Sequence, residues 1–295
     1  MSKGKPTHLY HYTSAEGLKG IVENRRIWAS DIFSLNDWEE FFHGRDAAER
    51  DLDKLLADAL GKDCQTIQWI KNEISQITVG MSLHTYVCSF SEEQDDLGQW
   101  RAYCPRGGFA IGFPFARLRE LTRENDSHFS LKRCTYRKEE RNAIIKTVVE
   151  DALKQKQDAY TKLLANAGDQ TAESAIRCAL SGALKWQLFE VCPTIKNKAF
   201  EGEKEWRLIS APRSDNYKNS RKFRIRDGLT IPYLEFPLND ADLWSQVEVC
   251  VGPSPYPEEA NKFARMLLLS GLEKKALPTG CVGRVRNSKV PYRYW

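Results

Sequence analysis

The stretch Leu9-Tyr10-His11-Tyr12-Thr13-Ser14 sets the interpretation of this sequence, because polar side chains alternate there with aromatic ones at the edge of a strand-like run. Two later stretches have the same character: Cys88-Ser89-Phe90-Ser91 and Glu203-Lys204-Glu205-Trp206-Arg207. Side chains alternate between the two faces of an extended strand. Three pairs of polar residues are therefore expected to share a face: His11 with Thr13, Ser89 with Ser91, and Glu203 with Glu205. These pairs predict one cleft built from distant parts of the chain.

Strand-like and helix-like segments are mixed from end to end, which predicts an α+β or mixed α/β fold. Ser14 is a candidate N-cap for a helix in which Leu18, Ile21 and Val22 repeat at helical spacing. Helical patterns are also expected over residues 38–77 and 257–269. Strands are expected over residues 81–90, 107–113, 206–209, 222–225, 229–236, 247–251, 281–285 and 290–292.

The segment from Lys138 to Phe189 has few Gly or Pro breakers and carries an apolar stripe that includes Ile145 and Val148. It predicts a helical insertion at about 138–189 that packs on the sheet and supplies no site residue. No stretch has the composition of a disordered linker. Residues 1–295 are therefore expected to form a single domain.

The composition is that of an ordinary globular protein, with 41% hydrophobic and 28% charged residues. No apolar run approaches the roughly 18 residues of a membrane span, so no membrane partner is expected. The first residues lack the apolar segment of a secretory signal, which predicts a cytoplasmic location. The net charge of +4 is too small to indicate a dedicated DNA-binding protein.

The 8 cysteines are scattered, with no Cys-x-x-Cys pair. A zinc ribbon or a redox motif is therefore not indicated, and reduced, mostly buried cysteines are expected. His8 falls on the opposite strand face from His11, which weakens a His-x-x-His metal site, and no metal is expected.

His11 allows two interpretations, since a single His among aromatic residues is more often a packed residue than a functional one. In the functional interpretation His11 donates to ribose hydroxyls, while Tyr12 and Thr13 help to hold a ligand. Ser89 and Ser91 would position the ribose, although serines at strand ends commonly satisfy local backbone groups. Phe90 would supply an aromatic contact. The acidic residues that follow are expected to cap a helix that brings Trp100 to the rim of the cleft.

Glu203 and Glu205 are the sharpest candidates, although a solvated turn of mixed charge would have the same sequence. Loss of a leaving group from a ribose builds positive charge, which one fixed carboxylate stabilises. Glu205 fits that role, and Glu203 fits a group that orients or deprotonates an acceptor. Arg207 is placed to engage a phosphate. Asn36 and Asp37 are either turn residues or part of a cleft wall.

These motifs, in this order, resemble the family known as domain of unknown function 2971: His-Tyr-Thr at residue 11, Leu35 to Glu39, Phe90-Ser91-Glu92 with Trp100, and Phe200 to Arg207. The His, Ser-x-Ser and Glu-x-Glu elements also resemble, more distantly, the ADP-ribosyltransferase superfamily. That resemblance implies an α+β fold like that of the ADP-ribosyltransferases, with a mixed, mainly antiparallel sheet. It also implies Glu205, Glu203 and His11 as catalytic residues. The cofactor-binding residues would be His11, Tyr12, Thr13, Ser89, Phe90, Ser91, Trp100 and Arg207.

The function implied by this resemblance is an NAD-consuming mono-ADP-ribosyltransferase, as in a bacterial toxin or an effector of anti-phage defence. NAD would be the substrate, and the acceptor, a protein or a nucleic acid, is left open. An NAD glycohydrolase and a non-catalytic nucleotide- or protein-binding sensor are alternatives. A metal-dependent nuclease would need Asp37, Glu39, Glu203 and Glu205 to cluster.

Overall fold

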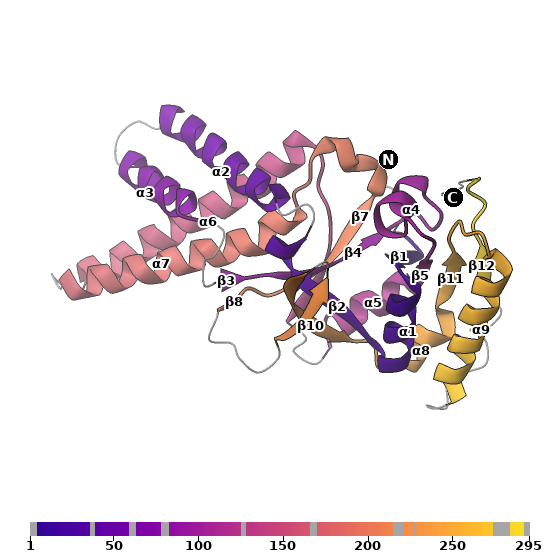
Figure 1. Cartoon of the computed structure of the whole chain (residues 1–295). Helices are drawn as coiled ribbons and strands as arrows, with labels where there is room; N and C mark the ends of the chain where they lie inside the picture. Colours follow the sequence, from indigo (N-terminus) through magenta and orange to yellow (C-terminus); the bar gives the residue numbers. More distant parts are fainter. Residues whose placement is uncertain are drawn as a thin grey trace.

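The fold was obtained from a computed structural model of the whole chain (Figure 1). The structure describes residues 5–35, 39–58, 63–77, 83–124, 128–165, 170–214, 221–226, 228–273 and 284–291. Helices and strands are mixed, and the sheet is mainly antiparallel, which confirms the predicted α+β class. None of the described helices is long and apolar enough to cross a membrane.

One sheet of ten strands forms the centre of the molecule, and eight of its strands follow the order β12-β11-β5-β1-β4-β2-β10-β9. The other two, β7 and β6, branch from β4. The strands are β1 (His8–Thr13), β2 (Arg26–Asp31), β4 (Tyr86–Ser91), β5 (Phe109–Pro114), β6 (Phe129–Arg133), β7 (Glu205–Ser210), β9 (Lys222–Arg226), β10 (Leu229–Pro237), β11 (Glu248–Val251) and β12 (Val285–Asn287). The short strands β3 (Leu83–His84) and β8 (Arg213–Ser214) pair separately.

The sheet divides at β4, and this division positions the site. β1 pairs with β4 only at Tyr10 opposite Ser91, whereas β2 pairs with it only at residues 86 and 87. Between these points one edge of β4 has no strand partner. Its other edge pairs continuously with β7, from Val87 opposite Ile209 to Ser91 opposite Glu205.

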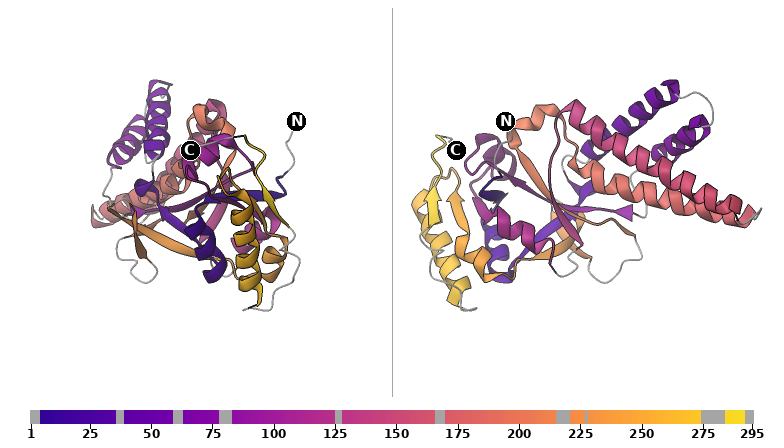
Figure 2. Two further views of the ribbon diagram at one scale, coloured as in Figure 1. Left: turned by 45° about the vertical axis from the view of Figure 1, so that its right-hand side comes forward. Right: turned by 180° about the vertical axis from the view of Figure 1, so that it is seen from behind.

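Two groups of helices cover the sheet (Figures 1 and 2). The first group is α1 (Ala15–Asn24), α5 (Phe115–Leu121), α8 (Ala241–Gln246) and α9 (Pro257–Glu273), which pack on the larger apolar core. The second group is α2 (Glu39–Asp58), α3 (Asp63–Ser75), α6 (Lys138–Ala165) and α7 (Gln170–Val191), which form a second core with Val87 and Ile209. α4 (Leu97–Tyr103) and the 3-10 helices η1 (Ile32–Ser34), η2 (Cys192–Thr194) and η3 (Lys198–Glu203) complete the chain.

Several local predictions are confirmed. Ser14 caps α1, because its hydroxyl accepts a hydrogen bond from the Gly17 N–H. α6 and α7 occupy the segment predicted to be helical, and Ile145 and Val148 of the apolar stripe are buried. In Figure 2 this pair of helices projects away from the sheet. Its interpretation as an insertion into a single domain stays a prediction.

The strand predictions near the end of the chain differ from the structure. The strand predicted at 290–292 is wrong for Val290 and Pro291, which lie outside any strand. The Val290 N–H donates to the Ser288 hydroxyl, and proline has no N–H to give to a neighbouring strand. The last strand is β12, and residues 281–283 and 292 lie outside the described part of the chain, as do residues 81 and 82.

Candidate functional site

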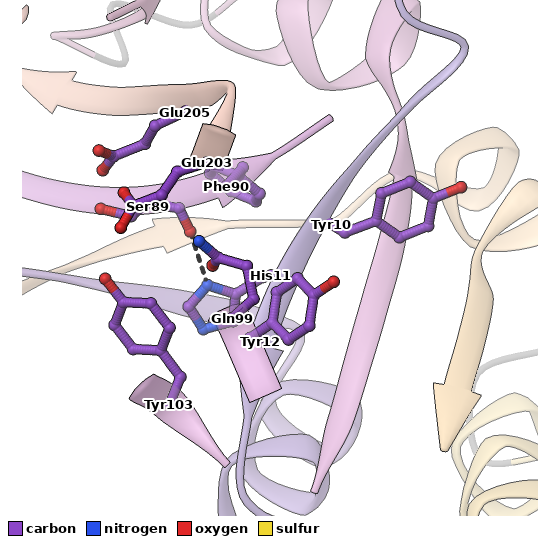
Figure 3. A pocket seen from close by; sticks show the side chains of 9 residues that line it. All are labelled: Tyr10, His11, Tyr12, Ser89, Phe90, Gln99, Tyr103, Glu203 and Glu205. Atoms are coloured by element: carbon purple, nitrogen blue, oxygen red, sulfur yellow. Dashed lines mark hydrogen bonds between the residues drawn. The ribbon is translucent and has the colours of Figure 1, made fainter. Parts of the chain in front are cut away.

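A small, partly open pocket lies where β1 and β4 separate. Distant segments supply its lining, which consists of Tyr10, His11, Tyr12, Ser89, Phe90, Gln99, Tyr103, Glu203 and Glu205 (Figure 3). The structure therefore brings one member of each of the first two predicted pairs, His11 and Ser89, to the same place as both carboxylates of the third pair.

His11 compensates for the missing strand partner at the free edge of β4. Its Nδ1 lies 3.0 Å from the Ser89 carbonyl oxygen. A carbonyl only accepts, so Nδ1 must carry the proton in this bond. Burial lowers the pKa of His11, and the positive charge of Arg224 lowers it further. A neutral ring protonated at Nδ1 leaves Nε2 as a hydrogen-bond acceptor. The ring can therefore accept from a ribose hydroxyl, and the prediction that it donates to one is wrong.

Cys88 is the thiol nearest to His11, with its Sγ 3.6 Å from Nδ1. Burial raises the pKa of this thiol well above its usual range, so it is no activated nucleophile. Five cysteines have side chains that the structure describes, at positions 88, 104, 134, 192 and 250, and all five are free and buried, as predicted.

Glu205 lies at the centre of a buried ion cluster. Its Oε1 accepts from Arg207 Nε at 2.8 Å, and its Oε2 accepts from Lys196 Nζ at 2.7 Å. Burial opposes ionisation, but the charges of Arg207 and Lys196 prevail and lower the pKa of Glu205 from 4.5 to about 2. The Glu205 N–H donates to the Tyr136 hydroxyl at 2.8 Å, which fixes the start of β7. Glu205 is therefore ionised at neutral pH and rigidly held.

Glu203 reaches the same cluster by a different route from the one predicted. It ends the 3-10 helix η3, and Lys204 has a left-handed conformation (φ 44°) before β7 begins at Glu205. The left-handed residue between them brings the two carboxylates together, and the prediction that they share one face of an extended strand is wrong. Glu203 also binds Lys196 Nζ, and its side chain keeps 21% of its surface exposed against 5% for Glu205. Glu203 is therefore the more accessible carboxylate.

Four of the predicted site residues do not line the pocket. The Thr13 side chain packs on Gly17 of α1, and the Ser91 hydroxyl donates to the Glu203 carbonyl at 2.7 Å. Trp100 is fully buried beneath Tyr12, and its indole N–H donates to Asp95 at 2.7 Å. Arg207 is buried and donates to Glu205 and to the Pro193 carbonyl. Their positions are those of supporting residues behind the pocket wall.

Sequence reasoning missed Lys196, Gln99 and Tyr103. Lys196 binds both carboxylates although it follows η2 in an irregular segment, where no pattern marks it. Gln99 and Tyr103 are four residues apart on α4, so they share a helix face toward the pocket. That spacing was available in the sequence, and the Asp96 side chain caps the helix as predicted.

Asn36 and Asp37 fall outside the described residues, as does the side chain of Glu39. Within the part of the chain that is described, no group of three or more His, Cys, Asp or Glu side chains is arranged to hold a metal ion. Lys196 and Arg207 neutralise the carboxylates of the pocket directly.

Comparison with known proteins finds one family model that matches part of the chain. Residues 99–208 match the model of a family described as "Protein of unknown function (DUF2971)". The match runs from α4 to β7 and so includes Gln99, Tyr103, Glu203 and Glu205, whereas His11 and Ser89 precede it. No curated protein and no solved structure matches the chain.

Proposed function

We propose that the pocket binds the nicotinamide riboside end of NAD and releases nicotinamide, passing ADP-ribose to a macromolecular acceptor. The observation that carries this proposal is the convergence of His11, Ser89 and two carboxylates, from three distant segments, on one small pocket. Tyr103 and Phe90 supply aromatic surface for a nicotinamide ring, and Nε2 of neutral His11 accepts from a ribose hydroxyl.

In this proposal Glu205 stabilises the positive charge that develops on the ribose as nicotinamide leaves. A carboxylate that is already ionised and fixed needs no reorganisation during the reaction. Glu203 is the more exposed of the two, so it acts on the incoming acceptor. When water is the acceptor, the same site is an NAD glycohydrolase.

A second candidate, a nucleotide-binding sensor without catalytic activity, is favoured by one observation. Both oxygens of Glu205 already accept hydrogen bonds from buried cations. Lys196 and Arg207 offset the negative charge that a developing cation requires. In the sensor, the ion cluster would be a structural element of the pocket wall.

Release of nicotinamide from NAD by the purified protein separates the two candidates. The proposal predicts release by the wild type with a cell extract as the source of acceptor. Glu203→Gln should reduce transfer to the acceptor more than it reduces hydrolysis, because its carboxylate acts on the nucleophile. Binding of NAD with no release of nicotinamide under any of these conditions would establish the sensor.

A further inference from the structure

The pocket raises the question of where the phosphates of a dinucleotide would lie. The pocket is small, so a pyrophosphate that continues from a ribose held in it would lie beyond its lining. A phosphate site next to the pocket therefore rests on the proposed function.

Arg207, predicted from the sequence to bind a phosphate, is committed elsewhere. It is buried, with Nε on Glu205 and a terminal nitrogen on the Pro193 carbonyl. Lys196 is equally committed to Glu203 and Glu205. A phosphate therefore needs a different cation.

Arg224 of β9 has the properties of such a cation. One of its terminal nitrogens donates to the Ser30 hydroxyl at 2.9 Å, and its guanidinium lies over the Trp28 ring, 5.8 Å from the centroid. The Trp28 ring packs in turn on Tyr233, with the two centroids 4.5 Å apart. These contacts fix the plane of the guanidinium, which favours directed binding of an oxyanion.

The hydrogen-bonding capacity of Arg224 is only partly used. Its Nε is buried and has no hydrogen-bond partner among the residues that the structure describes. A buried N–H without a partner is costly, and charged donors are the most costly of all. The oxygens of a phosphate would accept hydrogen bonds from this nitrogen and from the remaining N–H groups of the guanidinium.

Arg224 also lies on the pocket's side of the sheet. Its hydrogen-bond partner Ser30 pairs with Val87 of β4, which precedes the pocket residue Ser89 by two positions on the same strand face. The charge of Arg224 reaches His11, because it lowers the pKa of that ring. A phosphate between Arg224 and the pocket would therefore lie next to the ribose site.

We propose that Arg224, oriented by Trp28 and Ser30, binds the pyrophosphate of the dinucleotide whose riboside occupies the pocket. Arg224 is a binding residue in this proposal and takes no part in bond cleavage. The rival cation is the exposed Arg101 of α4, the helix that supplies Gln99 and Tyr103 to the pocket.

Calorimetric binding of two non-cleavable probes tests this assignment. The probes are an NAD analogue with a methylene group in place of the ring oxygen of the nicotinamide ribose, and the corresponding riboside without phosphate. Loss of a charge-assisted hydrogen bond should make Arg224→Gln bind the NAD analogue about tenfold to a hundredfold more weakly. Its affinity for the riboside should stay close to that of the wild type. The affinity of Arg224→Lys for the NAD analogue should lie between those of the wild type and Arg224→Gln, since lysine keeps the charge but lacks the parallel N–H donors of a guanidinium.

Arg226→Gln is the matched control, because it removes the same charge from the same face of β9 and should bind both probes normally. Equal affinity of wild type and Arg224→Gln for the NAD analogue would overturn the inference. So would an equal loss for both probes, or a loss seen with Arg101→Gln instead. A wild type that binds neither probe would refute the proposed function itself, whereas normal nicotinamide release with an unaffected Arg224→Gln would refute only the phosphate site.

Discussion

Replacing Glu205 by Gln should destabilise the protein by an amount that can be worked out from the ion cluster. The substitution keeps the shape of the side chain but leaves Lys196 and Arg207 buried with one carboxylate fewer. The folded protein holds the pKa of Glu205 at about 2 against an ordinary 4.5. A depression of that size corresponds to about 3 kcal/mol of unfolding free energy, the lower end of the roughly 3 to 5 kcal/mol for breaking a buried ion pair.

The stabilisation that Glu205 provides should decrease as the pH falls. A carboxyl group with a depressed pKa contributes its full stability well above 4.5 and loses it as the pH falls toward 2. The difference in stability between wild type and Glu205→Gln should therefore shrink by about 1.4 kcal/mol between pH 7 and pH 3.5. Other carboxyl groups titrate in both proteins, so their effects cancel in the difference.

Urea denaturation of both proteins at pH 7 and pH 3.5 measures this quantity directly. Glu203→Gln is the matched control, because it also removes a carboxylate from Lys196 but leaves the more buried Glu205 in place. Glu203→Gln should lower the unfolding free energy at pH 7 by less than Glu205→Gln does. Equal stability of wild type and Glu205→Gln at pH 7, or a difference that does not change with pH, would refute the description of the cluster. The same measurement also shows whether any loss of activity in Glu205→Gln reflects chemistry or unfolding.

Three further predictions follow from the packing around the pocket. Lys196→Met should lower the melting temperature, because it leaves Glu203 and Glu205 close together with less positive charge between them. An unchanged melting temperature in thermal unfolding followed by circular dichroism would contradict this. Gly108→Ala should destabilise the folded protein by about 1 to 3 kcal/mol, as overpacking does, because an added Cβ would lie 2.5 Å from the Thr13 carbonyl oxygen. Gly20→Ala is the control in the same melting experiment and should be tolerated, because an added Cβ there would meet nothing within 4 Å. Trp100→Phe should lower stability by about 1 to 3 kcal/mol, since it removes a buried donor to Asp95, and urea midpoints equal to those of the wild type would contradict this.

Local signals allowed much of the fold to be predicted from the sequence. The Ser14 cap, the alternating strands and the long helical pattern from 138 to 189 each depend on neighbouring residues, and the structure contains the corresponding elements. The branching of the sheet at β4 was not predictable in this way. It depends on which strands pair, and pairing is decided by packing between residues far apart in the chain.

The membership of the site was only partly predictable. His11, Ser89, Glu203 and Glu205 do line one pocket, whereas four other predicted residues lie behind its wall. Arg207 was expected to face a phosphate, but a buried carboxylate two residues away satisfies it instead. Lys196 escaped notice because its importance comes only from the two carboxylates that converge on it in three dimensions.

The central claim is that the pocket between β1 and β4 holds the riboside end of NAD. A crystal structure of the protein with the non-cleavable NAD analogue tests it most directly. The account predicts the nicotinamide ring beside Tyr103 and Phe90, with the ribose between His11 and the carboxylates of Glu203 and Glu205. An analogue bound elsewhere on the protein, or a pocket that stays free of it at saturating concentration, would contradict the claim.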